Sequence, residues 1–205
     1  MIDFEAVIRH FGPQAVALQL EEADSLDDKA LAALNSHNEP DRVTIVRRWL
    51  YDYQVFQGID GPKRTAITEA VLLWADSQQG QSDPATLDVL VRSHAGLMAA
   101  CSTAYGRGRD FTSLASKALW LRYPDVVPMF DSFAQRALWV ISKIEKDIAA
   151  PASEKSEYRK FAYAWRTLYG RYASTIAAVD ARGYPYRVRI FDKILWIIGS
   201  PGYVY

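Results

Sequence analysis

Hydrophobic residues recur at spacings of three and four along most of the chain, which is the spacing of amphipathic helices. Proline or capping residues precede the expected helices and glycine follows most of them, as at natural helix ends. The first half predicts helices in four places: after a cap at Ser25 through 30–34, from Pro40 to near Gly58, from Pro62 to Gly80, and from Asp83 to Gly106.

The second half of the chain continues the same pattern. It predicts helices from Thr112 or Ser113 through Trp120, from Asp131 over 133–144, over 158–172 with Gly170 as a point of interruption, and over 187–198. Alternation typical of strands is nowhere sustained. We therefore predict an all-α fold that forms a single helical domain over 1–205, with the break at 149–153 as the place where it would subdivide.

The composition indicates a folded chain whose charges are unevenly distributed along the sequence. Of the 205 residues, 50% are hydrophobic and 23% are charged, which excludes general disorder. The net charge is zero, but residues 1–41 hold nine acids against two bases, so the rest of the chain carries +7. A basic body behind an acidic segment is compatible with a polyanionic partner such as DNA.

Several classes of site are not expected. The single cysteine, Cys101, excludes an internal disulfide and a Cys-rich zinc site. His10, His37 and His94 have no cysteine or carboxylate at ligand spacing, so we expect no metal and no cofactor. The first residues do not resemble a signal peptide, and no apolar run is long enough to cross a membrane. These features predict a cytoplasmic protein with no membrane partner.

The segment 111–132 carries the strongest candidate chemistry. Lys117 lies in an otherwise apolar helix, the chain reverses between two prolines, and Asp131 begins the next helix. Two helices joined by a short reversal can bring the Lys117 ammonium and the Asp131 carboxylate into one cleft. Trp120 and Trp139, on the same two helices, could wall that cleft.

This segment resembles the catalytic stretch of the helix-hairpin-helix DNA glycosylases, particularly the 8-oxoguanine glycosylase branch. In that family a helix bearing a catalytic lysine precedes a Val-Pro-Val-Asp-like turn, and Lys117 and Val127-Pro128-Met129-Phe130-Asp131 match these parts. The hairpin signature Leu-Pro-Gly-Val-Gly does not occur, and the lysine and aspartate are only 14 residues apart. The segment is more similar to a divergent set of small bacterial proteins, some linked to phage defence.

A second segment, 186–199, is similar to the ends of those same bacterial proteins. Asp192 and Trp196 are four residues apart in it, hence on one helix face, where they could meet the cleft and contact a substrate. Arginines near this helix and on the earlier glycine-flanked loop are candidates for contacts with DNA phosphates: Arg107, Arg109, Arg187 and Arg189.

The resemblance implies a helix-hairpin-helix glycosylase-like domain that excises a damaged or modified base. A carboxylate such as Asp131 would stabilise the oxocarbenium and activate water, and Lys117 would assist. The residues also allow simpler roles, with Asp131 as a helix cap, Lys117 as a half-buried helix residue and Arg109 in a solvated loop. A non-catalytic helical module that binds nucleic acid or protein is therefore the alternative, and a small-nucleotide sensor or hydrolase is a third.

Overall fold

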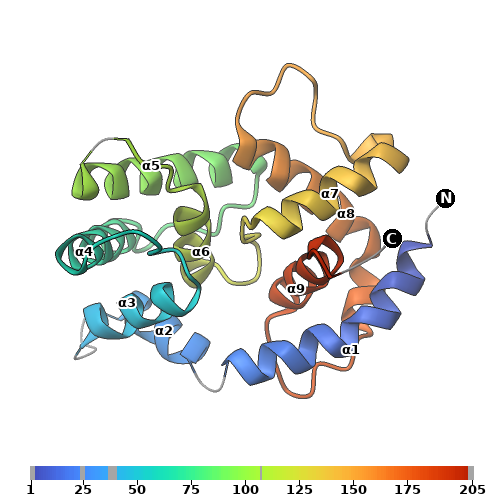
Figure 1. Cartoon of the computed structure of the whole chain (residues 1–205), viewed down its shortest axis with the longest axis horizontal. Helices are drawn as coiled ribbons and strands as arrows, with labels where there is room; N and C mark the ends of the chain where they lie inside the picture. Colours follow the sequence, from blue (N-terminus) through green and yellow to red (C-terminus); the bar gives the residue numbers. More distant parts are fainter. Residues whose placement is uncertain (1–2, 24–25, 37–40, 107, 203–205) are drawn as a thin grey trace. The chain divides into compact units, whose positions relative to one another are not determined.

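The computed structural model describes residues 3–23, 26–36, 41–106 and 108–202 (Figure 1). Over these residues the backbone forms α-helices and one short 3-10 helix, with no strand, so the prediction of an all-α protein is confirmed. The predicted starts at Ser25 and Pro40, together with His37 and Arg107, lie outside the described residues.

The chain divides into two compact units. Unit 1 comprises Met1–Glu22 and Pro128–Tyr205, and unit 2 comprises Ala23–Val127. Unit 1 is thus built from both ends of the chain, and unit 2 is the continuous stretch between them. The break at 149–153, named above as the place where a single domain would subdivide, lies inside unit 1.

Unit 2 is assembled around a helix that is buried on all sides. Its helices are α2 (Leu26–Asn35), α3 (Arg42–Asp52), α4 (Gly61–Ser77), α5 (Leu87–Tyr105) and α6 (Thr112–Arg122). Every residue of α6 from Leu114 to Leu121 is buried, and α6 contacts α2, α3 and α5. A helix that is apolar nearly all round requires such neighbours, because it has no face suited to water.

Two helix boundaries in unit 2 differ from the predicted ones. α3 ends at Asp52, well before Gly58, because Gln54 turns the chain with a φ of 57°. α5 begins at Leu87 instead of Asp83, because the Thr86 hydroxyl caps the helix by accepting from the Val89 amide at 3.3 Å. Serine and threonine are favoured at such positions because their hydroxyls satisfy a free helix amide.

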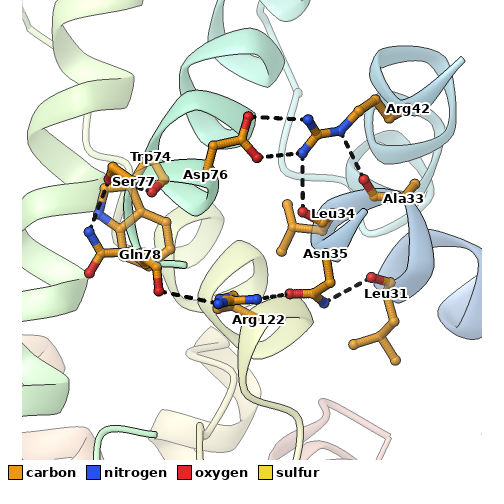
Figure 2. A network of polar contacts seen from close by, with 10 residues as sticks. All are labelled: Leu31, Ala33, Leu34, Asn35, Arg42, Trp74, Asp76, Ser77, Gln78 and Arg122. Carbon is orange, nitrogen blue, oxygen red and sulfur yellow. Dashed lines mark hydrogen bonds and ion pairs between the residues drawn. The ribbon is translucent and has the colours of Figure 1, made fainter. Parts of the chain in front are cut away.

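Polar contacts join the helix ends of unit 2, as Figure 2 shows. Arg42 forms a two-bond ion pair with Asp76, at 2.7 and 3.1 Å, and also donates to the carbonyls of Ala33 and Leu34 at the end of α2. Arg122 bridges the side chain of Asn35 and the carbonyl of Gln78. These contacts satisfy backbone carbonyls that would otherwise lack partners at helix ends.

Unit 1 is organised around a buried terminal helix. It contains α1 (Phe4–Ala23), α7 (Ser132–Ile144), the 3-10 helix η1 (Lys146–Ile148), α8 (Glu157–Ala177) and α9 (Arg187–Gly199). Residues 188–195 of α9 are all buried, and α9 packs against α7 and α8. α8 departs from helical geometry at Tyr172, two residues after the interruption predicted at Gly170.

α1 joins unit 1 although it is distant in sequence from the other helices of that unit. The ring of Phe4 lies 5.2 Å from that of Tyr172 and 6.4 Å from that of Phe191, measured between centroids. Gly12 lies close to Val179, where an added Cβ would come within 2.7 Å of a side-chain methyl carbon. No separate helix was predicted over residues 4–23.

Candidate functional site

Asp131 lies in unit 1 at the start of α7. Its backbone is extended, and its Oδ1 accepts from the amide of Phe133 at 2.9 Å, so the expected helix cap is present. The side chain is partly exposed. The amides of a helix N-terminus interact favourably with negative charge, which suits a carboxylate at this position.

A second aspartate supports the turn that carries Asp131. Asp192 of α9 is only 2% exposed, and its Oδ2 accepts from the amide of Met129 at 3.1 Å. Its Oδ1 accepts from the indole nitrogen of Trp165 at 2.6 Å. A buried carboxylate needs such donors to offset its lost hydration. The two segments singled out in the sequence are therefore joined within unit 1, and Asp192 contacts the turn from the protein interior.

Tyr158 closes the same buried region. Its hydroxyl lies 3.5 Å from the carbonyl oxygen of Pro128, the first residue of unit 1 after the return of the chain. Burial and, secondly, the negative charge of Asp192 raise the pKa of Tyr158, so this phenol stays neutral. Tyr158 and Asp192 thus enclose the turn before Asp131 from the interior of unit 1.

Trp196 also contacts the start of α7. Its ring meets that of Phe133 edge-on, with centroids 5.6 Å apart. The ammonium of the buried Lys193 lies 5.0 Å from the Trp196 ring centroid. Gly199 lies against the backbone of Phe133 so closely that an added Cβ would come within 1.8 Å of the Phe133 carbonyl oxygen. Trp196 is half-buried and packs against the residues that follow Asp131.

Lys117 lies in unit 2, on the enclosed helix α6. Its side chain is buried, with 6% of the residue exposed, and its Nζ donates to the Ser113 hydroxyl at 2.8 Å. Because Lys117 belongs to unit 2 and Asp131 to unit 1, the predicted convergence of the two side chains stays a prediction.

Trp120 occupies the core of unit 2. It is fully buried and stacks on Trp49, with ring centroids 6.0 Å apart and planes 3° from parallel. The Trp49 indole donates to the buried Asp27 at 2.7 Å. Trp120 therefore packs in the unit 2 core, and the substrate contact expected of it stays a prediction.

The candidate phosphate-binding arginines differ in their accessibility. Arg189 is buried within α9, and Arg187 donates to the carbonyls of Ile176 and Val179 near the end of α8. Arg109 is half-buried, donates to the Gln57 carbonyl and lies over the Tyr105 ring. Arg187 and Arg189 thus contribute to the fold of unit 1, and phosphate contacts by Arg109, Arg187 and Arg189 stay predictions.

The other candidate groups are enclosed. Burial lowers the pKa of His94 to about 4, against smaller opposing effects of its hydrogen bond to the Thr112 carbonyl and of Asp110. Burial raises the pKa of the Cys101 thiol to about 12. Among the described residues, no group of three or more His, Cys, Asp or Glu side chains could hold a metal ion. None of the described helices is both long and apolar enough for a membrane span.

Sequence reasoning named Trp139 as a possible wall of the cleft but did not single out the basic residues beside it. On α7, Arg136 and Lys143 flank Trp139 on the outward face, and Trp139 is the most exposed tryptophan among the described residues. Their spacing of three and four residues was a visible signal in the sequence, because it places all three on one helix face.

Comparison of the chain with protein-family models, with curated proteins and with solved structures finds no match.

Proposed function

We propose that this protein is a DNA glycosylase that excises a damaged or modified base, with Asp131 as its central carboxylate. The observation that carries the proposal is the way Asp131 is held. Its carboxylate is partly exposed at a helix N-terminus, on a turn fixed from the interior by Asp192 and Trp165. A hydrogen-bonded support of this kind suits a group that must keep one position during a reaction.

The proposed reaction breaks the bond between C1′ of deoxyribose and the base. The bonding electron pair leaves with the base, and positive charge builds on the sugar ring. The Asp131 carboxylate would stabilise this oxocarbenium and orient the water that adds to C1′, accepting its proton. The target base must first leave the DNA stack.

Lys117 is assigned an assisting role on the basis of the sequence resemblance. A neutral Lys117 amine that reached C1′ would attack directly and form a Schiff base, giving strand cleavage as well. A charged Lys117 would leave a monofunctional enzyme. Borohydride trapping separates the two, because only the first gives a covalent adduct that Lys117→Gln abolishes.

The proposal extends to phage defence. It does so because the segments at 111–132 and 186–199 resemble small bacterial proteins of which some are linked to such defence. The modified base would then belong to phage DNA.

One observation favours the alternative, a non-catalytic helical module that binds nucleic acid or a protein. Asp131 caps α7 and Lys117 bonds to Ser113, and both contacts stabilise helices without any reaction. Base release decides between the two functions, because a binding module releases no base.

The test measures release of free bases, by mass spectrometry, from duplexes carrying oxidised, deaminated and alkylated bases. Asparagine caps helices about as well as aspartate, so Asp131→Asn removes the charge and retains the fold. We expect the variant to lose base release by about 100-fold or more. Undiminished release by Asp131→Asn, or no release by the native protein from any duplex, would overturn the proposal.

A further inference from the structure

The outer face of α7 carries one large aromatic residue between two basic residues. Ser132, Arg136, Trp139 and Lys143 are all exposed, and their spacing of four, three and four places them on one side of the helix. We call these four residues the α7 outer face. The opposite side of the helix is buried in unit 1 through Ala134, Ala137, Leu138 and Ile141. Trp139 is 61% exposed, an unusual position for so large an apolar ring.

The positive charge of this face is not neutralised within the described part of the chain. Neither Arg136 nor Lys143 forms an ion pair with a described residue. The acids that follow α7 in sequence already have basic partners: Glu145 and Asp147 pair with Arg171, Glu154 with Arg159, and Glu157 with Lys160. The face is therefore complementary to an anionic partner.

The aromatic ring narrows the choice of partner. The Lys143 ammonium lies 4.7 Å from the Trp139 ring centroid, so positive charge already accompanies the indole. Arg136 and Lys143 are seven residues apart, which is about 10 Å along the helix, and Trp139 lies between them. Bases stacked on an aromatic ring with phosphates on flanking cations are the common pattern of single-strand binding.

A protein partner fits the same face less well. The other exposed large apolar residue of α7, Ile144, lies about 140° around the helix from Trp139. The two do not form one continuous apolar patch, which a protein interface normally provides at its centre. A single isolated indole between cations suits a nucleotide better.

We propose that the α7 outer face binds a single-stranded stretch of DNA, with Trp139 stacking on an unpaired base and Arg136 and Lys143 contacting phosphates on either side. This deepens the proposed function and rests on it for the choice of DNA. Since α7 begins directly after Asp131, the face would hold unpaired nucleotides of a substrate on the helix that follows the proposed catalytic turn.

The experiment measures binding of the full chain to a fluorescent single-stranded oligothymidine and to a duplex, by anisotropy over a salt series. Stacking on one ring predicts that Trp139→Ala weakens single-strand binding by roughly 5- to 100-fold. Trp139→Phe should recover part of the loss. The double change Arg136→Ala and Lys143→Ala should lower the slope of log K against log salt by about 1.4, since each phosphate contact contributes about 0.7.

Tyr51→Ala is the matched control. Tyr51 is 52% exposed on α3 of unit 2 and has the guanidinium of Arg64 over its ring. It therefore has the same combination of an exposed aromatic ring and a nearby cation as Trp139 with Lys143. Its removal should leave binding unchanged. Single-strand binding by Trp139→Ala as tight as native binding, or an equal loss in Tyr51→Ala, would overturn the inference. This assay measures binding and not base release. If binding depends on Trp139 but the protein releases no base, the glycosylase proposal is refuted and the single-strand binding site is not.

Discussion

The buried carboxylate of Asp192 accepts the amide of Met129, two residues before Asp131, and the indole N–H of Trp165 with its other oxygen. One side chain of α9 thus fixes the backbone from which the proposed catalytic carboxylate projects. The same pairing of a buried aspartate with an indole recurs in unit 2, between Asp27 and Trp49. In each unit an aspartate acts as an internal acceptor that orients a large aromatic ring.

Removing this acceptor should destabilise the protein. Asp192→Ala leaves the Met129 amide and the Trp165 indole without their carboxylate acceptor, and each buried donor left unsatisfied costs about 1–3 kcal/mol. We expect the free energy of unfolding to fall by about 2–6 kcal/mol, measured by urea denaturation. The exposed Asp147, changed to Asn, serves as control and should cost less than about 1 kcal/mol. A loss no larger than that of the control would contradict the role given to Asp192.

Two glycines in unit 1 offer a matched test of packing. Gly199→Ala would place a Cβ within 1.8 Å of the Phe133 carbonyl oxygen, so α7 and α9 must separate. We expect a loss of about 1–3 kcal/mol or more in unfolding free energy. Gly170→Ala meets nothing within 4 Å in α8 and should gain up to about 1 kcal/mol through helix propensity. Equal effects of the two changes would show that the close approach of Gly199 to Phe133 is not present in solution.

Stability should fall in mild acid because of His94. Its pKa is lowered by burial from 6.5 to about 4, so the unfolded chain takes up this proton at higher pH than the folded chain. The contribution is fully present above pH 6.5 and is lost as pH falls toward 4. Between pH 7 and pH 5 it amounts to about 2 kcal/mol.

The measurement is urea denaturation of the native protein and of His94→Gln at several pH values. Glutamine can still donate to the Thr112 carbonyl but does not titrate, so this part of the pH dependence should disappear. The exposed His10, changed in the same way, should leave the dependence intact. A pH profile that is identical in native protein and His94→Gln would rule out the assigned cause.

Cys101 should react with thiol reagents only when the protein opens. Burial raises its pKa to about 12, which leaves almost no thiolate at pH 8. Burial also keeps the reagent away from the sulfur. Because the chain has one cysteine, labelling by a chromogenic disulfide reports a single site. We expect negligible labelling in buffer and complete labelling in denaturing urea. Rapid labelling under native conditions would show that α5 is not packed as described.

Much of the helical fold could be predicted because hydrophobic spacing and end signals agree. The signals at Thr112, Asp131 and Arg187 each fall within one residue of an observed helix start. The helix over Phe4–Ala23 carries Pro13 within it, and the place of this helix in unit 1 depends on tertiary contacts of Phe4 with Tyr172 and Phe191. Contacts over such sequence distances leave no local signal.

The candidate site was harder to predict than the fold. The spacing of Asp192 and Trp196 places them on one helix face, but α9 is buried nearly all round, so spacing cannot tell a substrate contact from an internal one. The same reason applies to Trp120 on α6 and to Arg189 on α9. The role of Asp131 as a cap was predictable, because aspartate followed by serine before an apolar helix is a local signal.

The most direct test of the central claim uses a duplex with a pyrrolidine abasic-site analogue, whose cationic ring imitates the oxocarbenium whatever the base. Native protein should bind this duplex about 100-fold or more tightly than an unmodified duplex, over a salt series. Asp131→Asn, which keeps the cap of α7, should remove most of that preference. Equal, salt-sensitive binding of the two duplexes, or an undiminished preference in Asp131→Asn, would contradict a glycosylase centred on Asp131.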